Sequence, residues 1–227
     1  MASNVAQRRA MKAARCKQIL RARHSGEPVS LADKIRRLAA RPLHGCLLQP
    51  EMFDSGIGTV LLARRAESGE IAMATFLVDL FSIGIKDVFF RLVEPSEFDF
   101  YVTTMSLAAP YRPVAPSYAR KLLRDAAAYA ASLGLRPHRG FAAIELLFGD
   151  ARAEDCTEQF SFGRDGKPFY VAGPTESTAQ IARRLGRLAE RLGMDGFDFV
   201  VPLDDEICIA SENAEALLIP ASDRAAG

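Results

Sequence analysis

Two apolar runs lie close together in the chain, IGTVLLARR at residues 57–65 and EIAMATFLVDLF at residues 70–81. Both contain β-branched residues, and the segment AESG between them is short and turn-forming. This pattern predicts a β-hairpin. The second run is almost continuously apolar, so we expect it to be a central strand that is covered on both faces.

The strand pattern resumes after a short interruption. The segment SIG at residues 82–84 breaks the apolar run, and DVFFRLV at residues 87–93 continues it. This arrangement predicts either a third strand or a bulged continuation of the second. Helical periodicity follows, and each predicted helix ends at a glycine. These helices span residues 117–133, 139–148 and 177–192.

Further strands are expected near the C-terminus. The segment at residues 160–171 predicts two short strands around the turn RDGK, and three more apolar segments follow at residues 197–201, 207–210 and 216–219. The elements add up to a single α+β domain over residues 42–222, an antiparallel sheet with helices packed over it, followed by a flexible tail at 223–227. A ribonuclease H-like α/β sheet, in which three antiparallel strands precede alternating helices and strands, is the alternative.

Charge is distributed unevenly along the chain. Residues 1–41 contain eleven Lys and Arg but two Asp and Glu, a net charge of +9, whereas residues 42–227 carry −8 and the whole chain +1. We call residues 1–41 the basic arm. Residues 5–23 contain no Gly or Pro and predict a weakly ordered helix. A second helix is expected at residues 31–40, capped by Ser30 and Asp33.

The basic arm predicts a polyanionic partner, because each Lys or Arg that neutralises a phosphate releases a counterion. We expect a nucleic acid, and RNA before DNA. Three alternatives stay open: a solvated tail without a partner, an arm that docks on its own acidic body or on another protein, and an organelle-targeting peptide. The candidate nucleic-acid-binding residues are Arg8, Arg9, Lys12, Arg15, Lys17, Arg21, Arg23, Arg36 and Arg37.

Asp79 is the first candidate for chemistry, because a carboxylate inside an apolar strand needs a partner. We expect a structural pairing in which Lys86 neutralises Asp79 and backbone amides at Gly84 donate to it. No cofactor follows from that pairing. The alternative is an Mg²⁺ site formed by Asp79, Asp87 and Glu145, which would activate water for phosphodiester cleavage.

Two other polar features are weaker candidates. His138 lies between two predicted helices, where a capping or surface residue is more common than a general base, and no serine stands in a G-x-S-x-G elbow. Arg164 and Lys167 lie beside Phe169 and Tyr170, so they either contact a phosphate backbone or are solvated turn charges. The sequence therefore leaves enzymatic activity undetermined.

Composition favours a cytoplasmic protein. The 227 residues are 49% hydrophobic and 25% charged, as in an ordinary globular protein. The four cysteines are scattered without a C-x-x-C pair, which indicates reduced thiols rather than a zinc site. No apolar stretch approaches the roughly 20 residues of a membrane helix, and the first residues lack the apolar core of a secretory signal.

Three motifs resemble those of a family of uncharacterised bacterial proteins. They are FLVD with G-x-KD at residues 76–87, YA at 118–119 with YA-x-x-LG-x-x-PH at 129–138, and FGRDGKPFY with GP at 162–174. The resemblance covers most of residues 42–174 and implies a bacterial, intracellular, single-domain protein. It transfers no activity and no catalytic residue. It makes an organelle-targeting peptide less expected and favours a working role for the basic arm.

The leading hypothesis from the sequence is a non-enzymatic protein whose basic arm binds RNA or another polyanion. The first alternative is a metal-dependent nuclease or phosphodiesterase centred on Asp79. The second is a protein-interaction module.

Overall fold

The computed structural model describes residues 30–203, 206–211 and 214–220, with side chains described for residues 30–202. The chain divides into two compact units, Met1–Lys34 and Ile35–Gly227. Within the first unit, residues 30–34 are described. The helix expected at residues 5–23 and the tail expected at residues 223–227 lie outside the described residues.

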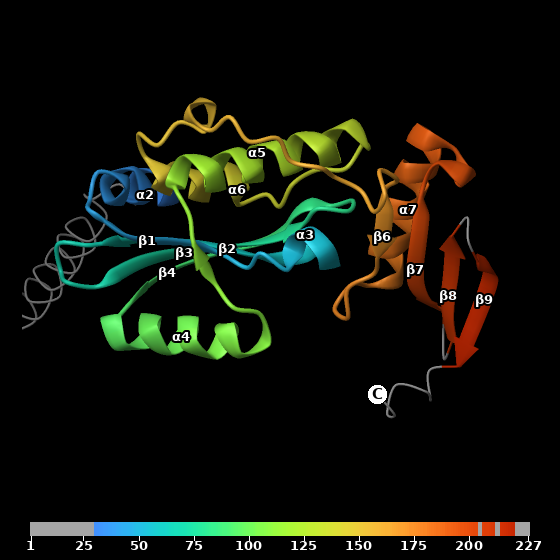
Figure 1. Cartoon of the computed structure of the whole chain (residues 1–227), viewed down its shortest axis with the longest axis horizontal. Coiled ribbons are helices and arrows are strands. Elements are labelled where there is room, and N and C mark those ends of the chain that lie inside the picture. The colour runs from blue at the N-terminus through green and yellow to red at the C-terminus, as the bar shows by residue number, and fades with distance from the viewer. Residues whose placement is uncertain (1–29, 204–205, 212–213, 221–227) are drawn as a thin grey trace, which may run out of the picture. The chain divides into compact units, whose positions relative to one another are not determined.

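Five antiparallel strands form the first sheet of the second unit (Figure 1). Their spatial order is β4-β3-β2-β1-β5. The β2–β3 hairpin confirms the prediction, and β4 confirms a third strand with a register shift opposite Leu77 and Val78. The strands are β1 (Leu43–Leu48), β2 (Ile57–Arg65), β3 (Ile71–Asp79), β4 (Gly84–Val93) and β5 (Arg112–Pro113).

β3 is buried along nearly its whole length because helices cover both faces of the sheet (Figure 1). On one face, Leu122 of α5 (Pro116–Ser132) packs in a core with Phe76. On the other face, Phe98 of α4 (Pro95–Ala108) packs in a separate core with Met73. The expectation of a central strand covered on both faces is therefore confirmed.

A second sheet follows in the order β6-β7-β8-β9. β6 and β7 are parallel and are connected through α7 (Thr178–Leu192), whereas the β7–β8 and β8–β9 pairs are antiparallel. The three strands expected near the C-terminus are confirmed. The strands of this sheet are β6 (Phe169–Val171), β7 (Asp198–Leu203), β8 (Glu206–Ser211) and β9 (Ala214–Pro220).

The fold class is α+β, as the sequence predicts, with helices packed over an antiparallel sheet. The ribonuclease H-like alternative requires the later strands to extend the first sheet by alternating with helices. Here the alternation β6-α7-β7 belongs to the second sheet, so the topology differs from that alternative.

Local sequence signals account for the helix starts. α2 (Leu31–Ala39) follows Ser30, whose hydroxyl oxygen accepts a hydrogen bond from the Asp33 amide at 3.1 Å, as the predicted cap requires. α7 follows Ser177, which forms a capping box with Gln180. Ile35 and Ala39 are buried, so the core of the second unit begins inside the segment that the sequence analysis assigned to the basic arm.

Some elements differ from the expectation. β1 and α4 had no predicted counterpart, and the helix expected at residues 139–148 is α6 (Phe141–Ile144) followed by the 3₁₀ helix η1 (Glu145–Phe148). α4 lacks helical periodicity, since polar and apolar residues are mixed on all sides of its sequence PSEFDFYVTTMSLA. The remaining short helices are α3 (Met52–Ser55), η2 (Ala153–Asp155) and η3 (Met194–Gly196).

The two strands expected within residues 160–171 reduce to one strand. β6 is present, but its expected partner is replaced by an isolated bridge between Arg164 and Lys167. The aromatic rings before the turn pack on α5 instead of entering a hairpin. Phe160 lies edge-on against Tyr118, and Phe162 stacks on Tyr129, with ring centroids 5.1 Å apart in both pairs.

Candidate functional site

Asp79 lies at the end of β3, where the chain turns toward β4, and it is 6% exposed. Its Oδ1 accepts hydrogen bonds from the backbone amides of Phe81 at 3.0 Å and Ser82 at 2.9 Å. These donors lie earlier in the turn than Gly84, where the sequence analysis placed them. Burial raises the pKa of Asp79, and the turn amides together with the charge of Lys86 oppose that rise only in part.

Lys86 forms its ion pair with Glu176 rather than with Asp79. The Lys86 Nζ lies 3.3 Å from Glu176 Oε1, and these side chains are 15% and 8% exposed. The Lys86 charge acts on Asp79 through space, so the expected neutralisation is present only as an electrostatic influence. The pairing with Glu176 was not predicted.

Glu176 is the centre of a buried polar cluster that sequence analysis missed. The hydroxyl of Tyr170, which is fully buried, donates to Glu176 Oε2 at 2.5 Å, and Arg184 forms an ion pair with the same oxygen. Burial alone would raise the pKa of Glu176, but the hydrogen bonds from Tyr170 and Arg184 and the charges of Arg184 and Lys86 hold it below its ordinary value. The carboxylate is therefore ionised and engaged at both oxygens.

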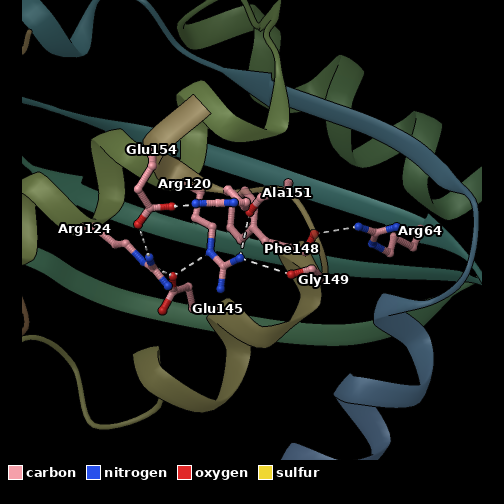
Figure 2. A network of polar contacts seen from close by, with 9 residues as sticks. Arg64, Arg120, Arg124, Glu145, Phe148, Gly149, Ala151 and Glu154 are labelled. Atoms are coloured by element: carbon pink, nitrogen blue, oxygen red, sulfur yellow. Dashed lines mark hydrogen bonds and ion pairs between the residues drawn. The ribbon is translucent and has the colours of Figure 1, made fainter. Parts of the chain in front are cut away.

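Glu145, the third member of the candidate Mg²⁺ site, belongs to a different cluster (Figure 2). Arg120 Nε donates to Glu145 Oε1 at 2.8 Å, and Arg124 Nε donates to the same oxygen at 2.6 Å. Both arginines come from α5. Two guanidinium groups thus neutralise Glu145 in place of a metal ion.

The same arginine cluster fastens the segment after η1 to the rest of the unit (Figure 2). Arg120 Nη1 also donates to the carbonyl oxygens of Gly149 at 3.1 Å and Ala151 at 2.7 Å. Arg64, which is 7% exposed, donates to the Leu147 carbonyl at 2.7 Å and the Phe148 carbonyl at 2.8 Å. These guanidinium groups thus hold carbonyls within and after the short helix against β2 and α5.

Asp79, Asp87 and Glu145 are not brought together. Among residues 30–202, no group of three or more His, Cys, Asp or Glu side chains lies close enough together to hold a metal ion. The candidate Mg²⁺ site therefore has no assembled ligand set in this part of the chain.

His138 and Asp87, two candidates from separate segments, do come together. His138 Nε2 lies 3.6 Å from Asp87 Oδ1, and the side chains are 33% and 40% exposed. The amide of Gly140 donates to His138 Nδ1 at 3.2 Å, which assigns the ring proton to Nε2, on the side of the carboxylate. Nδ1 is thus occupied by the Gly140 amide, whereas Nε2 faces the Asp87 carboxylate at a distance longer than a hydrogen bond.

The basic turn after Phe162 is engaged within the protein. Lys167 Nζ forms an ion pair with Asp198 Oδ1 at 2.9 Å, and the Arg164 guanidinium lies 4.9 Å from the centroid of the Phe169 ring. Of the candidate nucleic-acid-binding residues, Arg36 and Arg37 are described, and both are exposed on α2. The other seven, from Arg8 to Arg23, lie outside the described residues.

A cavity of about 230 Å³ adjoins Asp79 and Lys86. Its other walls are the segment Ser55–Ile57, the Phe81 ring, Phe169 of β6 and the segment Val171–Pro174. Apolar groups dominate the lining, and Asp79 and Lys86 supply its charged side chains.

Comparison with known proteins gave no relative: no family model, no curated protein and no solved structure matches this chain. The resemblance to a bacterial family therefore stays a prediction. In the described part of the chain, no helix has both the length and the apolar character needed to cross a membrane.

Proposed function

We propose that this protein binds RNA through its basic arm and acts as a binding protein rather than an enzyme. The segregation of charge carries this proposal: +9 over residues 1–41 against −8 over residues 42–227. Electrostatic attraction between Lys or Arg and phosphate supplies most of the affinity of sequence-independent nucleic-acid binding. Guanidinium groups also pair with phosphate in a bidentate manner, which suits an arm that is richer in Arg than in Lys.

The placement of the described cations supports the choice of the basic arm. In the second unit, Arg64, Arg120 and Lys86 are buried or nearly so and are engaged by carbonyl or carboxylate oxygens. Arg36 and Arg37, at the end of the basic arm, are exposed on α2. These three cations therefore serve the fold, whereas the guanidinium groups of Arg36 and Arg37 lie at the surface.

The net negative charge of residues 42–227 should direct a polyanion toward the basic arm. A surface with excess negative charge repels phosphate, so it directs a polyanion toward the basic arm. RNA is the preferred polyanion because flexible single strands can adapt to an arm that presents charges in series.

The test is binding of a fluorescently labelled single-stranded RNA to the full chain, measured by anisotropy. Arg36→Gln with Arg37→Gln should weaken binding several-fold, because the two guanidinium groups no longer neutralise phosphates. The matched control, Arg136→Gln with Arg139→Gln, removes two exposed arginines of the body and should leave affinity nearly unchanged.

Other outcomes would favour the alternatives. Cleavage of the RNA that depends on Mg²⁺ would favour a phosphodiesterase. Absence of RNA binding at low salt would contradict the proposal and favour a protein-interaction module.

A further inference from the structure

The cavity beside Lys86 has the make-up of a small-molecule site. Such sites combine mostly apolar walls with a few convergent polar groups. Here the rings of Phe81 and Phe169, whose centroids are 6.3 Å apart, and the side chains of Ile57 and Val171 supply apolar surface. Lys86 supplies a cation to the same space.

Two glycines in the lining bring backbone against these groups. Gly56 has φ +80°, and a Cβ there would lie 2.2 Å from the Phe81 ring. A Cβ on Gly173 would lie 3.2 Å from Lys86 Nζ and 3.0 Å from Glu176 Oε1. Larger residues at these positions would collide with the aromatic wall or crowd the ammonium group, so the glycines keep both accessible to the cavity.

The charged side chains at the cavity differ in how many of their donors or acceptors have partners within the protein. Glu176 receives donors from Tyr170 and Arg184 in addition to Lys86. Asp79 Oδ1 already accepts two backbone amides. Lys86 has three N–H donors, and its contact with Glu176 Oε1 at 3.3 Å is an ion pair that lacks hydrogen-bond geometry. The ammonium group therefore has donor capacity left, whereas Asp79 Oδ1 and Glu176 Oε2 already accept hydrogen bonds.

We propose that this cavity binds a small apolar monocarboxylate, with the ligand carboxylate paired to Lys86 and its apolar part in contact with Phe81 and Phe169. Of the described residues that line the cavity, Lys86 alone is cationic, which matches a ligand with a single negative charge. An amine ligand would be repelled by the same ammonium, and Oδ1 of Asp79, the anion of the lining, is already occupied by two backbone amides. The lining residues lie outside the basic arm, so the site is independent of the proposed RNA binding.

The experiment titrates the ¹⁵N-labelled full chain with benzoate, benzyl alcohol and benzylamine, and follows the amide resonances of Gly56 and Gly173. These ligands share one ring and differ in charge. Benzoate should shift both resonances saturably, with an affinity about tenfold above that of the alcohol, the gain expected from one charge-assisted hydrogen bond. Benzylamine should bind more weakly than the alcohol.

Variants locate the site. Lys86→Met should lower benzoate affinity about tenfold, to that of benzyl alcohol. The control Arg91→Met removes an exposed cation from the same strand and should leave the affinity unchanged. Ile57→Trp adds bulk to the cavity wall and keeps both Lys86 and Glu176, so it tests the site even where Lys86→Met does not fold, and it should weaken the binding of all three ligands. Equal affinities of benzoate and benzyl alcohol, an unchanged affinity in Ile57→Trp, or no saturable shift in the wild type would overturn the proposal.

Discussion

Lys86 Nζ and Glu176 Oε1 lie 3.3 Å apart and join the two sheets of the second unit. Lys86 belongs to β4 of the first sheet, and Glu176 lies between β6 and α7 of the second. A backbone hydrogen bond from the Phe169 amide to the Phe81 carbonyl at 3.1 Å runs across the same junction. The ion pair thus adds a polar link to a hydrophobic core that both parts share, in which Ile83 and Ala130 pack with Tyr170.

Lys86→Met should destabilise the protein by about 1–3 kcal/mol, because it removes the cation paired with the buried Glu176 carboxylate, which keeps Tyr170 and Arg184. Urea unfolding followed by circular dichroism measures the change. Arg91→Met breaks the exposed pair with Glu97 on the same strand and should change stability by less than about 0.5 kcal/mol. Equal effects of the two substitutions would show that the Lys86–Glu176 pair contributes no more to the free energy of unfolding than an exposed ion pair does.

Glu145→Gln should destabilise the protein by about 3 kcal/mol, because it leaves two guanidinium groups of α5 without their shared carboxylate. The destabilisation should be the same with and without Mg²⁺, since Arg120 and Arg124 occupy the carboxylate. Glu154→Gln, at the exposed end of the same cluster, serves as the control and should have no measurable effect. Stabilisation of the wild type by Mg²⁺ that Glu145→Gln abolishes would contradict this account.

Asp79→Asn should change how stability depends on pH. Burial raises the pKa of Asp79 in the folded protein. Protonated Asp79 therefore contributes to the free energy of unfolding. This contribution is fully present below the pKa of Asp in the unfolded chain, about 3.9, and is lost as the pH rises through the pKa of the folded protein. Asp79→Asn does not lose this contribution. The free energy of unfolding of the variant minus that of the wild type should therefore increase as the pH rises through the folded pKa of Asp79.

The measurement for Asp79 is urea unfolding of both proteins at a series of pH values from about 4 to neutrality. Asp99→Asn, on the exposed side of α4, removes a carboxylate without altering a buried one. Its free energy of unfolding should depend on pH as that of the wild type does. A difference between Asp79→Asn and wild type that shrinks as the pH rises would have the wrong sign for a desolvated carboxyl.

Cys46 and Cys156, the cysteines whose side chains the structure describes, should differ in reactivity. Burial raises the pKa of the Cys46 thiol to about 12, and the positive charge of Arg64 offsets this only in part. Cys156 is half-buried. Because the thiolate is the nucleophile, iodoacetamide at neutral pH should alkylate Cys156 well before Cys46. Peptide mass spectrometry of the native protein reads the order, and equally fast modification of Cys46 would show that β1 opens readily.

Periodicity and capping carried most of the fold prediction. The β2–β3 hairpin, the Ser30 cap of α2 and the helix α5 were predictable because each rests on neighbouring residues. α4 was missed because its apolar residues face the core and solvent alike: Phe98 is buried, whereas Phe100 is 71% exposed. The separation into two sheets was also missed, since strand patterns do not specify which strands pair.

The polar sites were predictable only in part. A partner for Asp79 could be inferred from its apolar strand, and the turn amides do supply one. Glu176 was missed because its partners Tyr170, Arg184 and Lys86 come from three elements, and nothing in the local sequence brings them together. The one signal was its place directly before the Ser177 cap, where acidic residues favour a helix start.

The salt dependence of RNA binding tests the proposed function most directly. Affinity of the full chain for a labelled single-stranded RNA should fall steeply with salt, and changing Arg8, Arg9, Lys12 and Arg15 to Gln should reduce the slope of log affinity against log salt by about 0.7 for each phosphate no longer neutralised. Changing four exposed body arginines, Arg91, Arg112, Arg136 and Arg139, to Gln should leave the slope as it is. An identical slope in the wild type and the arm variant, or no RNA binding even at low salt, would contradict the account.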